Sequence, residues 1–279
     1  MKKLLVLGNP IDHSKSPIIH NTWLKKYKKK SFYDKLKIEE HEIKGIINKI
    51  KSNELIGANV TLPHKKNVIK YLDILEENSI NSGAVNTIYK KNSKIIGANT
   101  DGDGFLSSVK NDAGFIITKK SNIFIIGAGG AARGIIFSLV KKNVNKILIT
   151  NRTSTKIVDL LNDVKYNTKY NEFITQKWGN NIIPNDVDLV VNTSSFGMKK
   201  NEHLYYDFSN CKENLLVYDI IYSPEETYFL KIAKGKGFKI QNGMGMLIRQ
   251  AALSFYKWFG KEITEDDIIE MINSFKEQF

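Results

Sequence analysis

The segment NIFIIGAGGAARGIIFSLV, residues 122–140, constrains the fold more than any other part of the 279-residue chain. A short apolar run enters a cluster of glycines and continues as a second apolar run with helical spacing. Gly127, Gly129 and Ala132 fit the pattern G-x-G-x-x-A in the strand–turn–helix context that this pattern requires. The glycines allow a tight turn and let a pyrophosphate approach the backbone, and the helix N-terminus stabilises the anion. The segment therefore predicts a dinucleotide site, with an ordinary strand–helix turn as the alternative.

The end of the next expected strand indicates which dinucleotide is bound. Proteins that bind NAD usually carry Asp or Glu about 20 residues after the glycines, where it accepts the ribose hydroxyls. Here LITNRTSTK brings Asn151, Arg152 and Thr153 to the strand end, with Lys156 shortly after. A carboxylate would repel a 2′-phosphate, whereas a guanidinium binds it with paired donors. The sequence thus predicts NADP, unless Arg152 is an ordinary surface charge.

Apolar strands alternate with helical segments along the chain, which favours an α/β fold with mainly parallel sheets. The expected strands are residues 3–7, 32–38, 58–61, 122–127, 146–151, 188–192, 216–220 and 238–241. The expected helices are residues 17–28, 43–51, 65–72, 102–111, 131–142, 244–259 and 265–276. Residues 83–101 are typical of a hairpin with its turn near residues 91–93. Because the middle section completes a nucleotide-binding pattern by itself, we expect two α/β domains. Residues 102–242 form a Rossmann-type NADP-binding domain, and residues 1–101, rejoined by 243–279, form the other.

The net charge and the cysteine content limit which binding partners and which cellular compartment are expected. The net charge of +13 and pI near 9.5 make nucleic acid a partner to consider. However, the basic residues are scattered lysines, which indicates a coding bias, so we expect no nucleic-acid partner. Cys211 is the single cysteine, which excludes an internal disulfide and fits a reducing compartment. Its simplest interpretation is a small buried apolar residue.

Neither of two apolar segments predicts a membrane or export signal. The N-terminal apolar run is only four residues long, which is too short for a signal peptide. Residues 123–140 carry Arg133 in their middle, which argues against a membrane span. We therefore expect a cytoplasmic protein without membrane contact.

The segment GNPIDHSKSPIIHN places two hydroxyls, Ser14 and Ser16, just before Pro17. This is a common helix opening, with Ser16 as the N-cap and Pro17 at the first helical position. Two hydroxyls beside a helix N-terminus also suit a carboxylate ligand, and both readings stay open. His13 and His20 are isolated, and no group of His, Cys, Asp or Glu has the spacing of metal ligands, so we expect no metal.

Seven segments taken together resemble the shikimate dehydrogenases in order and spacing. They extend from Gly8 to Ala252 and read GNPIDHSKSPIIHN, GANVTLPHK, SGAVNT, GANTDGDG, GAGGAARG, NRT and NGMGMLIRQAA. The resemblance implies an oxidoreductase of the shikimate pathway, which leads to chorismate and the aromatic amino acids. It would reversibly reduce 3-dehydroshikimate to shikimate with NADPH, as a monomer or homodimer. The alternatives are the quinate/shikimate dehydrogenases that use NAD and a non-catalytic relative.

The resemblance also implies a role for individual residues. Residues 1–101 would be the substrate domain, with Lys65 and Asp101 as the catalytic pair. The substrate-binding residues would be Ser14, Ser16, Thr61, Asn86, Tyr222 and Gln250. The cofactor-binding residues would be Gly127, Ala128, Gly129, Gly130 and Ala131 at the pyrophosphate, Asn151, Arg152, Thr153 and Lys156 at the adenosine phosphate, Ile220 and Gly243 near the nicotinamide, and Glu77 at the cofactor edge. This chain departs from the family at Ser82, where alanine is usual, and at Thr193 and Ser194, which replace alanine and threonine.

The chemistry of ketone reduction supports the catalytic pair. Hydride delivery develops negative charge on the carbonyl oxygen, so a positioned cation stabilises the transition state and supplies the proton. A lysine is charged at neutral pH, and an adjacent carboxylate orients its ammonium. The neighbours Lys66 and Asp103 are the same residue types, but we expect them to be solvated surface charges.

Overall fold

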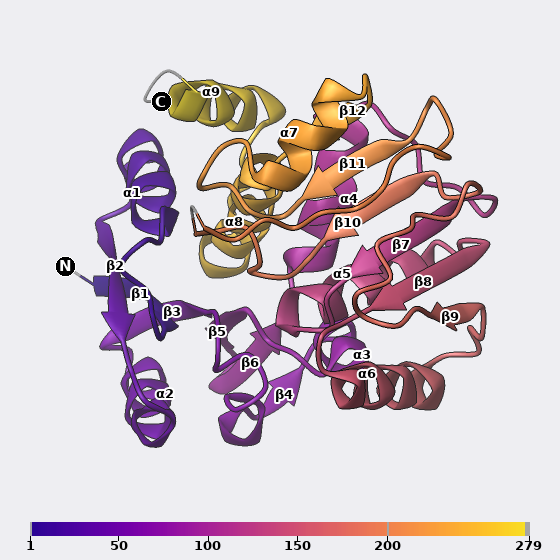
Figure 1. Ribbon diagram of the computed structural model, residues 1–279. Coiled ribbons are helices and arrows are strands. Elements are labelled where there is room, and N and C mark those ends of the chain that lie inside the picture. Colours follow the sequence, from indigo (N-terminus) through magenta and orange to yellow (C-terminus); the bar gives the residue numbers. More distant parts are fainter. Residues whose placement is uncertain (1, 200, 277–279) are drawn as a thin grey trace. The chain divides into compact units, whose positions relative to one another are not determined.

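The computed structural model describes residues 2–199 and 201–276 (Figure 1). Its chain forms two compact units, which we call the first unit (Met1–Gly104 with Leu247–Phe279) and the second unit (Phe105–Met246). The chain passes from one unit to the other inside helix α4 (Asp101–Asn111) and returns inside α8 (Met244–Phe259). Both changes lie a few residues beyond the expected positions, because each helix continues across its boundary.

The sheet of the first unit has six strands in the order β2-β1-β3-β5-β6-β4. The strands are β1 (Lys2–Gly8), β2 (Ser31–Lys37), β3 (Leu55–Val60), β4 (Ile74–Leu75), β5 (Thr87–Lys91) and β6 (Lys94–Ala98). Strand β1 is parallel to β2 and β3, and β4 is parallel to β6. Strand β5 is antiparallel to β3 and β6. The β5–β6 turn is formed by Asn92 and Ser93, both with positive φ, as two-residue hairpin turns require.

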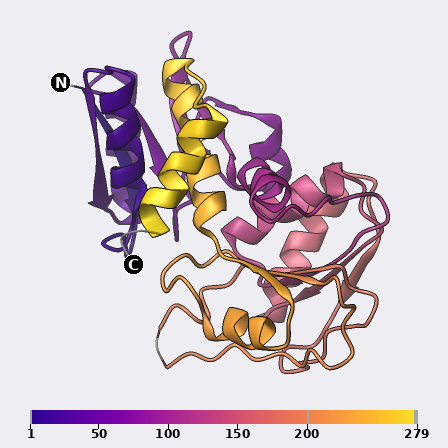
Figure 2. The ribbon, with the colours of Figure 1, turned by 90° about the horizontal axis from the view of Figure 1, so that it is seen from above.

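Helices cover both faces of this sheet. Helix α2 (Ile43–Lys51) buries four isoleucines against one face, at positions 43, 46, 47 and 50. On α1 (Ser16–Lys26), β2 and α8, aromatic rings gather into a cluster made of His20, Trp23, Tyr33, Phe255 and Trp258. Helix α9 (Glu265–Lys276) lies beside α1 (Figure 2), where Lys26 Nζ is 2.5 Å from Asp267 Oδ1. The short elements are α3 (Glu77–Ser82) and the 3₁₀ turns η1 (Glu40–Glu42) and η2 (Ile69–Tyr71).

The sheet of the second unit is entirely parallel, in the order β12-β11-β10-β7-β8-β9. Its strands are β7 (Asn122–Ile126), β8 (Lys146–Thr150), β9 (Phe173–Thr175), β10 (Leu189–Asn192), β11 (Leu216–Asp219) and β12 (Lys239–Gln241). The chain extends the sheet from β7 to β9 and then restarts at β10 on the other side of β7. The strand order therefore reverses between β7 and β10, and ligands of such sheets bind beyond the carboxyl ends of the strands at this point.

Both faces of the parallel sheet are buried. Alternate strand residues such as Ile123 and Ile125 pack with α4, α5 (Gly130–Lys141) and α6 (Ser154–Asn167). Phe124 and Ile126 face the other side, where α7 (Tyr228–Gly235) and residues 183–187 and 204–208 contribute side chains. Burial on both faces explains why these strands are almost continuously apolar in sequence. The predicted α/β class with a Rossmann-type domain is confirmed. The sheet of the first unit, predicted to be mainly parallel, is mixed, with three parallel and two antiparallel strand pairs.

The predicted helix over residues 65–72 is wrong. The segment forms turns and ends in the single 3₁₀ turn η2. A helix would pair the carbonyl of Lys65 with the amide of Ile69, but Val85 N donates to Lys65 O at 2.8 Å. Ile69 N instead donates to Lys66 O at 3.2 Å. A contact with a remote strand thus replaces the local helical pattern.

Among the strands and α-helices described between residues 2 and 276, five were not predicted from the sequence: β4, α3, α6, β9 and α7. Four of them are only two to eight residues long, which leaves little periodic signal. Helix α6 did carry a signal, because Ile157, Leu160 and Val164 recur at helical spacing and are buried. None of the helices described between residues 2 and 276 combines the length and apolarity needed to span a bilayer.

Candidate functional site

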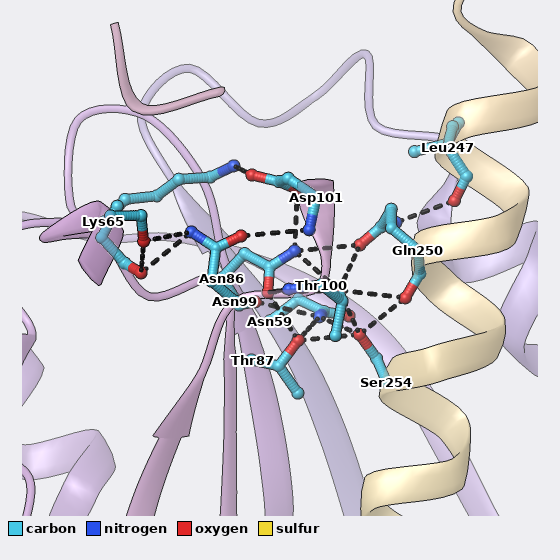
Figure 3. A network of polar contacts seen from close by, with 12 residues as sticks. Asn59, Lys65, Asn86, Thr87, Asn99, Thr100, Asp101, Leu247, Gln250 and Ser254 are labelled. Atoms are coloured by element: carbon cyan, nitrogen blue, oxygen red, sulfur yellow. Dashed lines mark hydrogen bonds and ion pairs between the residues drawn. The ribbon is translucent and has the colours of Figure 1, made fainter. Parts of the chain in front are cut away.

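The first unit brings together Lys65 and Asp101, the two residues that the family resemblance pairs. Lys65 Nζ lies 2.5 Å from Asp101 Oδ2, and the two side chains are 12% and 7% exposed (Figure 3). Lys65 follows β3 in a turn, and Asp101 is the first residue of α4. Lys66 and Asp103 are exposed, and Asp103 accepts a hydrogen bond from Asn78 Nδ2. Burial therefore distinguishes Lys65 and Asp101 from their neighbours of the same type.

Asn86 connects this pair to helix α8. Its Nδ2 donates to Asp101 Oδ1 at 2.8 Å, to Thr100 Oγ1 at 2.9 Å and to Gln250 Oε1 at 3.2 Å (Figure 3). Its Oδ1 accepts from Thr100 N at 2.9 Å. An amide has two hydrogens and cannot serve three acceptors equally, and the contact to Gln250 is the longest. The side-chain oxygen of Gln250 is therefore the acceptor best able to exchange Asn86 for a ligand hydroxyl.

A second layer of polar contacts holds Asp101 in place. Asp101 N donates to Asn99 Oδ1 at 3.0 Å, and Asn99 Nδ2 donates to Ala84 O at 2.9 Å and to Ser82 Oγ at 3.1 Å. All of these residues are buried. The serine at position 82, which the sequence left unexplained, thus accepts a hydrogen bond from the residue that orients the backbone of Asp101.

Asn59 and Ser254 extend the network beneath Asn86. Asn59 Nδ2 donates to Asn86 O at 3.0 Å and to Ser254 Oγ at 3.1 Å, and its Oδ1 accepts from Tyr33 Oη at 2.7 Å. Neither Asn59 nor Ser254 was predicted as a site residue. A signal existed for Ser254, because it lies four positions after Gln250 and therefore on the same face of α8.

The predicted substrate-binding hydroxyls of the first unit follow β1 and β3 in the chain. Thr61 directly follows β3, and its amide donates to Leu7 O at 2.8 Å. A Cβ on Gly8 would come within 2.5 Å of Thr61 Cγ2, so glycine permits this close approach of the two strand ends. Ser14 is half-buried and Ser16 is buried.

The prediction that Ser16 is the N-cap of α1 is wrong. The helix begins at Ser16 itself, and the N-cap is Lys15, whose side chain makes no cap bond. Ser14 Oγ accepts from Ser16 N at 3.3 Å, so the loop before the helix supplies the partner locally. The Ser16 side chain is turned into the protein instead of capping its own helix.

The glycine turn of the second unit lies between β7 and α5, and several close contacts fix its conformation. Gly127 has φ +115°, its amide donates to Thr150 O at 2.8 Å, and a Cβ there would lie 2.6 Å from Thr193 Oγ1. Gly129 is the exposed N-cap of α5, and a Cβ on it would meet no atom of the described residues within 4 Å. Ala128 N donates to Asn151 Oδ1 at 3.1 Å, which ties the turn to the end of β8. Gly130 and Ala131 form the first turn of α5. The turn thus presents an open helix N-terminus suited to a phosphate group.

Basic residues surround the start of α6. Arg152, Thr153 and Lys156 are exposed, and Thr153 is the N-cap of α6 without a side-chain cap bond. Asn151 Nδ2 donates to Thr153 O at 2.8 Å. Arg152 has no ion-pair partner within residues 2–199 and 201–276, so its guanidinium is available to an anionic ligand.

The remaining predicted cofactor residues lie in different units. In the second unit, Gly243 N donates to Ile221 O at 3.0 Å, and a Cβ on Gly243 would come within 1.9 Å of Ile220 O. Tyr222, a predicted substrate residue, also belongs to the second unit and is half-buried. Glu77 belongs to the first unit, where it is the exposed first residue of α3.

Over the described parts of the chain, no three His, Cys, Asp or Glu side chains form a group that could hold a metal ion.

Comparison with known proteins assigns the family. Residues 6–88 match the substrate-binding domain of shikimate dehydrogenase, residues 112–222 match shikimate/quinate 5-dehydrogenase, and residues 243–270 match the shikimate 5′-dehydrogenase C-terminal domain. A curated relative, shikimate dehydrogenase (NADP(+)) of Pelagibacter ubique, is 40% identical over 257 residues, which cover 92% of this chain and 93% of the relative. The chain belongs to the shikimate dehydrogenase family.

Solved shikimate dehydrogenases share the fold over nearly the whole chain. A crystal structure of shikimate dehydrogenase in complex with NADP⁺ matches with a TM-score of 0.89 and 34% identity, covering 98% of this chain and 95% of that one. The enzyme of Thermus thermophilus, in complex with NADP(H) and shikimate, matches with a TM-score of 0.83 and 27% identity, covering 98% and 99%. In this chain, the buried ion pair and the glycine turn lie in separate compact units.

Proposed function

We propose that the protein is an NADP-dependent shikimate dehydrogenase. It reversibly reduces 3-dehydroshikimate to shikimate, in the pathway toward chorismate and the aromatic amino acids. The observation that carries the proposal is the buried Lys65–Asp101 pair, joined through Asn86 to Gln250 in a family whose members catalyse this reaction. Cys211 is the single cysteine and is half-buried, so the chain forms no internal disulfide, which fits the reducing cytoplasm.

The residues of the second unit fit NADP. The amides of the first turn of α5 and the open space beside Gly129 suit the pyrophosphate, since a side chain at that position would occupy the approach. Arg152 and Lys156 supply positive charge at the start of α6, where they would hold a 2′-phosphate. When bound, NADPH supplies the hydride that reduces the ketone.

The first unit supplies the proton and orients the substrate. The Lys65 ammonium would stabilise the negative charge that develops on the carbonyl oxygen and donate the proton that completes the alcohol. Asp101 holds the ammonium through Oδ2 and would accept from a substrate hydroxyl. Asn86, Gln250 and Thr61 offer amide and hydroxyl groups for the ring hydroxyls. Ser14 and Ser16 would bind the substrate carboxylate. Tyr222, which belongs to the second unit, is a further proposed substrate contact.

The test is a spectrophotometric assay of NADPH formation from shikimate and NADP. The wild-type protein should turn over. Lys65→Ala should lower kcat at least ~100-fold with little change in the KM for shikimate, because the ammonium acts mainly in the transition state. Lys66→Ala is the matched control, since it removes the adjacent exposed lysine, and it should retain near-normal kcat. Near-normal turnover in both variants would rule out Lys65 as the catalytic residue.

Asp101→Asn tests the second member of the pair. The amide keeps the shape of the carboxylate but loses the charge that orients the ammonium, so kcat should fall. The KM for shikimate should also rise, because Asp101 is proposed to bind a substrate hydroxyl. An unchanged kcat and KM would remove Asp101 from the site.

A further inference from the structure

Asp219 is a buried carboxylate without a role in the proposed reaction. It is the last residue of β11 and has no solvent exposure. Its Oδ1 accepts from Ile221 N at 3.0 Å and from Asn192 Nδ2 at 3.1 Å, and its Oδ2 accepts from Thr227 Oγ1 at 2.8 Å. No cation is among these partners, and burial raises the pKa of the carboxyl to about 6. A charged group this deeply buried is costly to retain, so its three contacts call for an explanation.

The three contacts lead to three different segments at the carboxyl edge of the parallel sheet. Asn192, at the end of β10, uses its Oδ1 to accept from Ser194 Oγ at 2.7 Å and from Ser194 N at 3.1 Å. Thr227 is the N-cap of α7, where its Oγ1 accepts from Leu230 N. Ile221 lies in the loop after β11. One carboxylate therefore joins the loop after β10, the loop after β11 and the start of α7.

The loop after β11 contacts Gly243, where the surrounding backbone leaves no space for a Cβ. Ile221 donates its amide to Asp219, and its carbonyl accepts from Gly243 N at 3.0 Å. The backbone of Ile220 fills the space that a Cβ on Gly243 would need. The positions of Ile220 and Gly243 thus depend on the conformation that Asp219 imposes on Ile221.

We propose that Asp219 is a positioning residue for the cofactor, holding Ile220 and Gly243 in the arrangement that receives the nicotinamide end of NADP. The proposal rests on the proposed function, since it takes these two residues as cofactor contacts. It also explains why the residue is an acid. Three donors converge on two oxygens, and an asparagine in the same place would leave the Thr227 hydroxyl proton without its acceptor.

The experiment compares Asp219→Asn with Asp207→Asn in the full-length protein. Asp207→Asn is the control, because the Asp207 side chain accepts from the backbone and side chain of Ser209, and these hydrogen bonds do not involve Asp219, Ile220 or Gly243. Thermal unfolding checks folding, calorimetry measures the Kd for NADP, and kinetics give both KM values. For Asp219→Asn we expect a folded protein, at least ~10-fold weaker NADP binding and a shikimate KM within about twofold of wild type, from the loss of one or more hydrogen bonds. Asp207→Asn should leave all three constants unchanged.

A second pair of variants addresses the same contact from the other side. Thr227→Val removes the hydroxyl that Asp219 accepts and should weaken NADP binding in the same direction, whereas Thr227→Ser keeps the hydroxyl and should restore it. A lower unfolding temperature with unchanged NADP Kd in both Asp219→Asn and Thr227→Val would show a purely structural role and overturn the proposal. If wild type binds NADP but does not oxidise shikimate, the proposed function fails while the calorimetry still decides the role of Asp219. If wild type does not bind NADP, both proposals fail.

Discussion

Acid should destabilise the first unit through one buried histidine, His20. The ring is fully buried on α1, stacks on Tyr33 with centroids 4.3 Å apart, and lies 5.2 Å from the ring of Trp258. Neither ring nitrogen has a hydrogen-bond partner among the described residues. Burial lowers the pKa of His20 from 6.5 to about 3, and the neighbouring Asn59 side chain opposes this shift only partly. The folded protein therefore holds His20 neutral at pH values where the unfolded chain protonates it.

The sign and size of the effect follow from these two pKa values. Because the pKa is lower in the folded state, the unfolded state gains the proton first, and stability is lost as the pH falls from 6.5 toward 3. At about 1.36 kcal/mol per pH unit, the loss between pH 7 and pH 5 is about 2 kcal/mol. His20→Leu replaces the ring with an apolar side chain that cannot be protonated, so this part of the pH dependence should disappear.

Urea unfolding followed by tryptophan fluorescence provides the measurement. Trp23 and Trp258 both adjoin His20, so their emission reports on this unit. Between pH 7 and pH 5 the free energy of unfolding should fall by about 2 kcal/mol more in wild type than in His20→Leu. His41→Gln changes an exposed histidine and should keep the wild-type pH dependence. Equal pH dependence in wild type and His20→Leu, or an NMR titration of His20 near its ordinary pKa of 6.5, would refute the reasoning.

Three further predictions concern the cofactor and the support of Asp101. Arg152→Gln should lower kcat/KM for NADP roughly 10- to 100-fold and change kcat/KM for NAD little, because it removes charge-assisted bonds to a 2′-phosphate; wild type using NAD at least as well as NADP would contradict this. Gly243→Ala should raise the KM for NADP at least ~10-fold, since its Cβ would lie 1.9 Å from Ile220 O, whereas Gly235→Ala, with open space around its Cβ, should not. Ser82→Ala should lower the free energy of unfolding by about 1 kcal/mol in urea titrations, because Asn99 loses a buried acceptor; unchanged stability would show that this contact contributes nothing.

Local signals in the sequence were enough to predict the fold class and the cofactor of the second unit, although α6, β9 and α7 were missed. The glycine turn at residues 127–131, the apolar strands and the absence of an acid after β8 are properties of neighbouring residues, and each restricts backbone conformation or charge where it stands. For this reason the Rossmann-type fold and the cofactor class could be predicted from the chain alone. The pairing of Lys65 with Asp101 is different, because 36 residues separate them. It was predicted from the resemblance to a family, not from any property of either segment.

Tertiary structure decided what depends on partners that are remote in the chain. The amide of Val85 donates to the carbonyl of Lys65, which prevents a helix over residues 65–72 although this segment by itself favours one. Ser82 is a hydrogen-bond acceptor only because Asn99 packs beside it. Asp219 joins three segments because the fold brings Ile221, Asn192 and Thr227 to its side chain. Sequence patterns record the preferences of each segment. A buried polar group obtains its partner only when distant segments pack together, so these contacts could be read only from the folded chain.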